Sequence, residues 1–192
     1  MTAAAAAIVS RQQLVLCVDE CHLHWGDALG YVWGPQGKRV RLPMTNGQER
    51  QTYYGALDVL TGRAFTWSAP GGDSDQTVRF FKALRRRFQG RRMVILWDGA
   101  SYHRSAEVQA YLQQVNAGGA ETAWRIQCVM FAPYAPQQNP MEDVWLAGKT
   151  AVRRMWQTLS TFAEVKQGFC AHIEKTIFQF EKLNWYGRLQ FI

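Results

Sequence analysis

The sequence predicts an α/β fold in which helices flank a mixed sheet, with three antiparallel strands first and parallel strands after them. Three observations predict it: an apolar run of strand length at 14–19, a β-rich region with turns up to residue 70, and alternating helical and strand periodicity thereafter. Parallel strands need crossover connections, which the predicted helices supply. The chain has 192 residues, 47% of them hydrophobic, which suits one domain, expected at 13–192 behind a short flexible N-terminus at 1–12.

The first third of the chain is expected to be mostly β. LVLCVD at 14–19 is predicted to be a central strand, because it is nearly all apolar and ends in an acid. Segments 30–43 and 50–70 are rich in β-branched and aromatic residues and contain the turn sequences GPQG and LTG. This pattern favours antiparallel strands joined by hairpins.

From residue 76 onward, helical and strand patterns alternate. Apolar residues recur at helical spacing in two segments, and two apolar runs have the length of a strand. The predicted elements, in order, are a helix at 76–88, a strand at 91–98, a helix at 105–115 capped by Ser105, and a strand at 125–133.

Two further helices are predicted after residue 138. Asn139 suits the N-cap and Pro140 the first helical position, so a helix begins here. Glu142 follows three residues after the cap, where it is either a capping-box partner or a chemical group. The last helix is predicted within 160–180, because its opening STFAE has the capping-box pattern.

Composition narrows the classes of function. The formal charge is +7, from 22 Lys and Arg against 15 Asp and Glu, which favours polyanionic partners, nucleic acid first. No stretch approaches the roughly eighteen apolar residues of a membrane span, and no signal-peptide pattern is present, so a soluble intracellular protein without membrane contact is expected. The 4 cysteines are irregularly spaced, which argues against a disulfide framework and a zinc site.

Two acids follow apolar strands in the same way. Asp19 ends LVLCVD and Asp98 ends MVILWD, so neighbouring central strands would bring the two carboxylates together. Like charges repel there unless a cation neutralises them, and Mg²⁺ prefers oxygen ligands. With Glu142 as a third carboxylate, such a site suits two-metal phosphoryl transfer. Each acid also has a structural interpretation: Asp98 as part of a turn, Asp19 as a strand end, and Glu142 as a helix cap.

The order VDE, DGASYHRS and APYAPQQNPMEDVW resembles the DDE transposase family, specifically the mariner-like transposases of bacterial insertion sequences. The resemblance runs from about residue 12 to 158, and its last motif is the most specific. It implies a ribonuclease H-like catalytic domain whose catalytic and metal-binding acids are Asp19, Asp98 and Glu142. The spacing between the second and third acids is longer than is usual in the family, and Gly99 stands where relatives often carry Asn.

The resemblance also implies cofactors and partners. Two Mg²⁺ ions, with Mn²⁺ as a substitute, would serve in-line attack of water or a 3′-hydroxyl on a phosphodiester, so that DNA is cut and strands are joined. The partners would be transposon ends and target DNA, bound by a homo-oligomer that is a dimer on DNA, in the bacterial cytoplasm at the nucleoid. Relatives carry helix-turn-helix modules ahead of this domain, so a separate DNA-recognition domain or chain is expected.

His103 is a further candidate catalytic residue. It follows Asp98 by five residues, where the family often has a histidine, and it would contact phosphate or position water, or else serve as a capping or packing group. Glu20 and Asp143 adjoin proposed ligands and are expected to be structural or to support those ligands indirectly. Two other functions stay open: a catalytically silent nucleic-acid-binding module derived from a transposase, and a structure-selective nuclease of the same fold.

Basic residues gather after Glu142 on the same predicted helix, at Lys149, Arg153 and Arg154. This placement favours a track for the DNA backbone leading to the acids, because phosphate contacts position a protein on a duplex. The alternative is an ordinary solvated helix face.

Overall fold

The computed structural model describes residues 12–30, 33–38, 48–132 and 136–187. A five-stranded sheet in the order β3-β2-β1-β4-β5 forms its centre. β1, β2 and β3 are antiparallel neighbours, whereas β4 and β5 run parallel to β1, as predicted. The strands are β1 (Gln13–His24), β2 (Arg50–Asp58), β3 (Arg63–Ala69), β4 (Arg92–Trp97) and β5 (Ile126–Met130).

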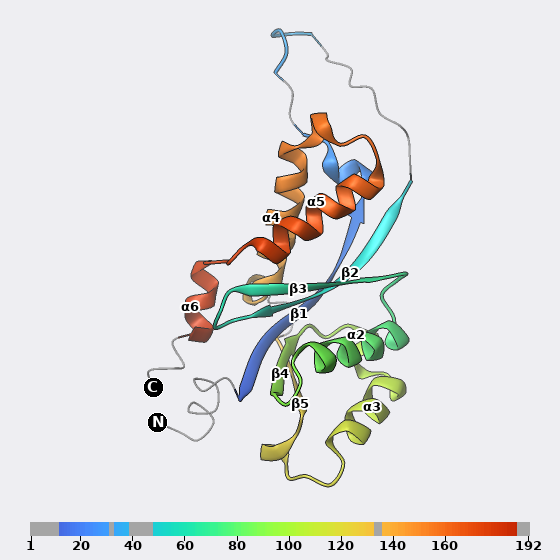
Figure 1. Cartoon of the computed structure of the whole chain (residues 1–192), viewed down its shortest axis with the longest axis vertical. Helices are drawn as coiled ribbons and strands as arrows, with labels where there is room; N and C mark the ends of the chain where they lie inside the picture. The colour runs from blue at the N-terminus through green and yellow to red at the C-terminus, as the bar shows by residue number, and fades with distance from the viewer. Residues whose placement is uncertain (1–11, 31–32, 39–47, 133–135, 188–192) are drawn as a thin grey trace.

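Helices cover both faces of this sheet. Figure 1 shows α2 and α3 on one face and α4, α5 and α6 on the other, and each face buries its own apolar cluster. Within the described ranges, no helix has the length and apolar character needed to cross a bilayer. The helices are α2 (Ser74–Arg87), α3 (Ala106–Asn116), α4 (Met141–Arg154), α5 (Phe162–Lys175) and α6 (Glu181–Gly187), and short 3-10 turns include η1 (Trp25–Ala28) and η2 (Ser101–Arg104).

The central strand β1 contributes to both cores, because successive side chains of a strand point to opposite faces. Leu14, Leu16 and Val18 pack against the α2 and α3 side, and Cys17 and Cys21 against the α4 and α5 side. A shift of one residue would exchange the two sets, so the register of β1 is strongly specified.

β1 is longer than the strand predicted at 14–19. It pairs with β4 only over Gln13–Cys17, but its ladder with β2 continues to His24. The prediction that Asp19 ends its strand is therefore wrong. The antiparallel ladder extends the strand after the parallel pairing has stopped.

The segment predicted as hairpin strands at 30–43 is described only in part. GPQG forms the predicted turn, in which Lys38 N donates to Pro35 O at 3.1 Å and Gly37 adopts a φ of 76°, a conformation that favours glycine. The rest of that prediction, at 31–32 and 39–43, lies outside the described residues. So does the predicted flexible N-terminus up to residue 11.

Side-chain caps set where most of the helices begin. Ser105 accepts from Val108 N at 3.3 Å and caps α3, as predicted. The predicted capping box at Thr161 is also present at the start of α5. α2 begins slightly earlier than predicted, since Asp73 accepts from Gln76 N at 2.8 Å and caps it.

The single helix predicted within 160–180 is wrong beyond Lys175, where α5 ends. Ile177 instead forms an antiparallel bridge with Arg63 of β3, and Phe178 N donates to Gly62 O at 2.8 Å. These bonds to the sheet edge hold the chain extended before α6 begins. The helix α6 was not predicted as a separate element.

Candidate active site

The sheet register places the first two acids side by side. Cys17 of β1 pairs with Leu96 of β4, and continuing this parallel register by two residues sets Asp19 opposite Asp98. The two carboxylates interact electrostatically, since the charge of Asp98 contributes to raising the pKa of Asp19. The structure thus brings Asp19 and Asp98 together.

Asp19 is a largely desolvated carboxylate. Burial raises its pKa to about 7, and the charges of Glu20 and Asp98 add to this, against the lowering effect of hydrogen bonds from the Glu20 backbone and the Trp145 side chain. Trp145 Nε1 donates to Asp19 Oδ2 at 3.1 Å. A carboxylate whose charged form is disfavoured in this way gains from a neighbouring cation.

Asp98 lies at the more open side of the pair, with its side chain 55% exposed. Its Oδ1 is 3.0 Å from His103 Nδ1 and accepts from Ala100 N at 3.0 Å. The hydrogen bond from His103 lowers the pKa of Asp98, with burial opposing it. The turn predicted after β4 is therefore present. The Asp98 carboxylate that closes this turn also interacts electrostatically with Asp19.

His103 is buried, with 1% of its side chain exposed, and it joins two carboxylates. Besides Asp98 it contacts Glu20, with Nε2 3.2 Å from Oε1, and its ring stacks on Trp97 at 4.2 Å between centroids. Burial alone would lower its pKa, but the bonds to Asp98 and Glu20 raise it to about 9. His103 therefore links Asp98 to Glu20.

The charge of His103 predicts a pH dependence of stability. Its folded pKa of about 9 exceeds the ordinary value of 6.5, so its contribution is complete below pH 6.5 and is lost as the pH rises through 9. We expect the free energy of unfolding of metal-free protein to fall by up to about 3 kcal/mol between pH 7 and 9.5. Denaturant titrations should show a much smaller fall for His103→Gln.

His172→Gln is the matched control for that measurement, because His172 lies on α5, away from the acids. It should retain the wild-type pH dependence. Equal slopes for His103→Gln and wild type would contradict the assigned charge of His103.

Glu142 lies exposed in the first turn of α4. Asn139 Oδ1 accepts from Met141 N at 3.0 Å and Pro140 has helical dihedral angles, so the predicted start of the helix is confirmed to within one residue. The capping-box interpretation of Glu142 is wrong: within the described residues, no main-chain N–H at the start of α4 donates to the Glu142 side chain.

A close helix–sheet contact sets the first turns of α4 against the sheet beside Asp19. Glu142 and Trp145 share one face of α4, because residues three apart are neighbours on a helix, and the Trp145 indole reaches Asp19. Gly55 pairs with Asp19 across the β1–β2 ladder. A Cβ at Gly55 would lie 2.4 Å from both Met141 Cε and Trp145 Cη2, so α4 comes this close only over a glycine.

The acids fit a divalent cation by chemistry, although they do not form a closed cage. Across the described ranges, no three His, Cys, Asp or Glu side chains converge closely enough to hold an ion. Asp19 and Asp98 nonetheless offer hard oxygen ligands whose mutual repulsion a cation would relieve, and Glu142 is exposed on the helix above them. These residues suit Mg²⁺ or Mn²⁺ better than zinc.

The basic residues that follow Glu142 mostly make internal contacts. Lys149 Nζ lies 3.0 Å from Asp27 Oδ2, and Arg153 Nε donates to Asp27 O at 3.1 Å. These contacts hold η1 against α4, and Arg154 is left exposed. The predicted track for the DNA backbone is therefore reduced to Arg154 on this helix.

Comparison with known proteins gives one family match and several structural matches. The sequence profile of the DDE superfamily endonucleases matches residues 14–163, which include all three acids. No curated protein matches significantly. Among solved structures, a pre-cleavage Mos1 transpososome is similar with 14% identity and a TM-score of 0.59, covering 94% of this chain and 54% of that chain.

Two viral proteins are similar as well. The intasome of simian T-cell lymphotropic virus has 13% identity and a TM-score of 0.59, covering 93% of this chain and 54% of that chain. The catalytic core domain of BIV integrase has 12% identity and a TM-score of 0.53, covering 86% of each chain. This chain thus spans about half the length of the transpososome and intasome chains, 54% in each case.

At these identities the likeness concerns the fold, and it confirms the predicted ribonuclease H-like arrangement of a mixed sheet between helices. The profile match covers most of the chain, from β1 through β4 to α4 and into the start of α5. The chain therefore belongs to the DDE superfamily endonuclease family.

Proposed function

We propose that the chain is the catalytic domain of a transposase that cuts DNA and transfers strands with divalent metal ions held by Asp19, Asp98 and Glu142. The observation that carries the proposal is the juxtaposition of Asp19, within β1, and Asp98, directly after the neighbouring parallel strand β4, where burial and repulsion raise the pKa of Asp19. Family membership supports nuclease chemistry. The similar structures include a Mos1 mariner paired end complex with Mn, which supports Mg²⁺ with Mn²⁺ as a substitute.

Each acid has its own part in the proposed chemistry. When bound, two Mg²⁺ ions activate the attacking oxygen and stabilise the leaving oxygen of a phosphodiester. Asp19 would hold a cation strongly because charge interactions strengthen where water is excluded. His103 keeps Asp98 oriented, and Glu142 offers an exposed carboxylate where a DNA backbone can approach.

The proposed reaction has two steps. Water attacks the phosphorus atom in line as the P–O3′ bond breaks, which leaves a 3′-hydroxyl and a 5′-phosphate. That 3′-hydroxyl then attacks a phosphodiester of target DNA, and the P–O3′ bond of the target breaks as the new bond forms. Neither step requires a covalent bond to the enzyme.

DNA is the proposed partner, both as transposon ends and as target. The formal charge of +7 supports binding to a polyanion. We propose a homo-oligomer that is a dimer on DNA, located at the bacterial nucleoid. This chain covers only 54% of the solved Mos1 chain. The remaining part of that longer chain supports our proposal of a separate DNA-recognition domain or chain.

A metal titration tests the proposal. Millimolar Mn²⁺ should raise the melting temperature of wild type by several degrees, because a ligand that binds only the folded state stabilises it. Asp98→Ala should not respond. Asp75→Ala is the control and should respond fully, since Asp75 is an exposed acid paired with Arg79 on α2. If the melting temperature of wild type does not change with Mn²⁺, the acids alone do not form the metal site.

One observation favours a second candidate, a catalytically silent DNA-binding module. Within the described residues, the three acids are not drawn together into a metal-holding group. DNA binding and biological activity that survive Asp98→Asn unchanged would support this candidate. Loss of activity with retained DNA binding would support the transposase.

A further inference from the structure

The last helix, α6, contacts the chain just before Glu142. Tyr186 donates its hydroxyl proton to the main-chain carbonyl of Gln138, with 2.5 Å between the oxygens. The side chain of Gln138 in turn accepts from Ala132 N at 3.2 Å, which joins the two ends of the connection between β5 and α4. Tyr186 therefore helps to fix the point from which α4 starts.

α6 also contacts the residue just after Glu142. Lys182 Nζ lies 2.7 Å from Asp143 Oδ2, a buried oxygen that has no well-aligned hydrogen bond to any described residue. Among the described residues, Lys182 is thus the cation that balances the negative charge of the Asp143 carboxylate. Since Lys182 and Tyr186 are four residues apart, they lie on one face of α6, and that face holds the chain on both sides of Glu142.

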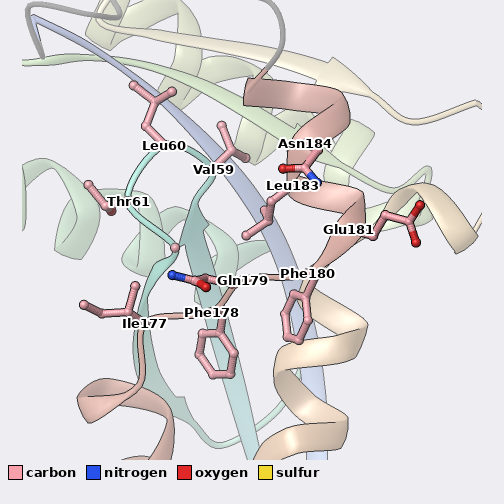
Figure 2. Close-up of a pocket in the computed structure, with 11 residues that line it drawn as sticks. Val59, Leu60, Thr61, Ile177, Phe178, Gln179, Phe180, Glu181, Leu183 and Asn184 are labelled. Carbon is pink, nitrogen blue, oxygen red and sulfur yellow. The ribbon is translucent and has the colours of Figure 1, made fainter.

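Among the described residues, apolar packing also holds α6 in place. Leu183 is 8% exposed and, with the Tyr186 ring, joins the apolar cluster beneath α4 and α5. A cavity of about 480 Å³ borders the helix, between the β2–β3 turn at 59–62 and residues 177–184 (Figure 2). A helix of 7 residues is not stable alone in water, so its position depends on these contacts.

We propose that Lys182 and Tyr186 are positioning residues for the third acid: docked α6 fixes segment 138–143 and so holds Glu142 over the sheet near Asp19. The inference rests on the proposed function, because Glu142 acts as a ligand only if the acids bind metal. α6 lies beyond residue 163, where the family profile match ends. Docking of α6 would then control the position of Glu142, although all three acids lie within the segment that matches the family.

Hydrogen exchange of the protein without metal or DNA tests the docking itself. The double variant combines Tyr186→Phe, which removes only a hydroxyl group, with Lys182→Met, which removes a charge at nearly constant length. The amides of Met141 and Glu142 should exchange about tenfold faster, since two contacts that hold their segment are lost. The amides of β1 and β4 should exchange as in wild type.

Two matched variants control for the chemical changes. Tyr111→Phe removes a buried hydroxyl that has no hydrogen-bond partner among the described residues, and Lys175→Met removes an exposed charge at the end of α5. Neither should alter exchange at Met141 or Glu142. Unchanged exchange at these amides in the double variant would overturn the inference, as would an equal acceleration across β1 and β4.

A Mn²⁺ titration separates this inference from the proposed function. If the acids bind metal, the double variant should need several-fold more Mn²⁺ than wild type to reach half of the maximal thermal shift, and the two controls should match wild type. Equal Mn²⁺ affinity in the double variant would overturn the positioning role. If wild type itself does not respond, the acids alone do not form the metal site, and hydrogen exchange alone decides whether α6 holds the segment.

Discussion

Asp19→Asn is expected to reduce DNA cleavage by about a thousandfold or more and, in the same variant, to stabilise the metal-free protein at pH 8. Asparagine has the same shape and keeps an oxygen that can accept from Trp145 Nε1, which is 3.1 Å from Asp19 Oδ2. It lacks the charge that metal binding requires. The same charge, buried next to Asp98, destabilises the protein when metal is absent.

The sign of the stability effect follows from the raised pKa of Asp19. The folded state has a pKa of about 7 against an ordinary value of 3.8, so it binds the proton more tightly than the unfolded chain does. The destabilisation is absent below pH 3.8 and complete above pH 7. Allowing for solvent screening, it amounts to roughly 2–4 kcal/mol.

Melting temperatures in a metal chelator at pH 5 and pH 8 measure this effect. The advantage of Asp19→Asn over wild type should be larger at pH 8 and should reverse when Mn²⁺ is added. Asp75→Asn, an exposed acid on α2, should show no such advantage. Wild-type cleavage by Asp19→Asn would remove this acid from the mechanism, and equal stability at both pH values would contradict its burial cost.

Gly55→Ala is expected to lower the free energy of unfolding by about 1–3 kcal/mol and to reduce cleavage at least tenfold. The added Cβ would lie 2.4 Å from Met141 Cε and Trp145 Cη2. The Met141 side chain can swing aside, but the buried Trp145 ring is stacked on Phe169, so α4 is expected to move away from the sheet. That movement carries Glu142 away from Asp19 and weakens the Trp145 hydrogen bond. Chemical denaturation and cleavage assays below the unfolding transition would measure both losses.

Gly71→Ala is the matched control, because a Cβ at Gly71 would meet no atom within 4 Å. It should leave stability and cleavage close to wild type. A stable and fully active Gly55→Ala protein would show that the close approach of α4 does not position Glu142.

Much of the fold could be predicted because apolar periodicity records which side chains are buried. The runs before Asp19 and Asp98 gave two neighbouring central strands, and local caps such as Ser105 gave helix starts. The continuation of β1 to His24 could not be predicted, because it depends on pairing with β2. The extended stretch around Ile177 likewise depends on the distant β3.

The candidate site shows the same division between local and distant information. The acids themselves could be proposed from their places at the ends of apolar runs and at a helix start. The bridge from Glu20 through His103 to Asp98 could not, since only the folded chain shows that His103 is buried between them. The role of Gly55 had no local signal, whereas Trp145 could have been found from its spacing of three residues from Glu142.

The parallel pairing of β1 with β4 joins parts of the chain that are far apart in the sequence. Each of the three acids comes from a different element, and no hairpin or other local unit contains two of them. A proteolytic fragment, or a truncated translation product, that starts after residue 19 or stops before residue 142 lacks at least one carboxylate. Under the proposed function, a fragment that lacks any of the three carboxylates is therefore inert, and cleavage of the chain between them does not release an uncontrolled nuclease.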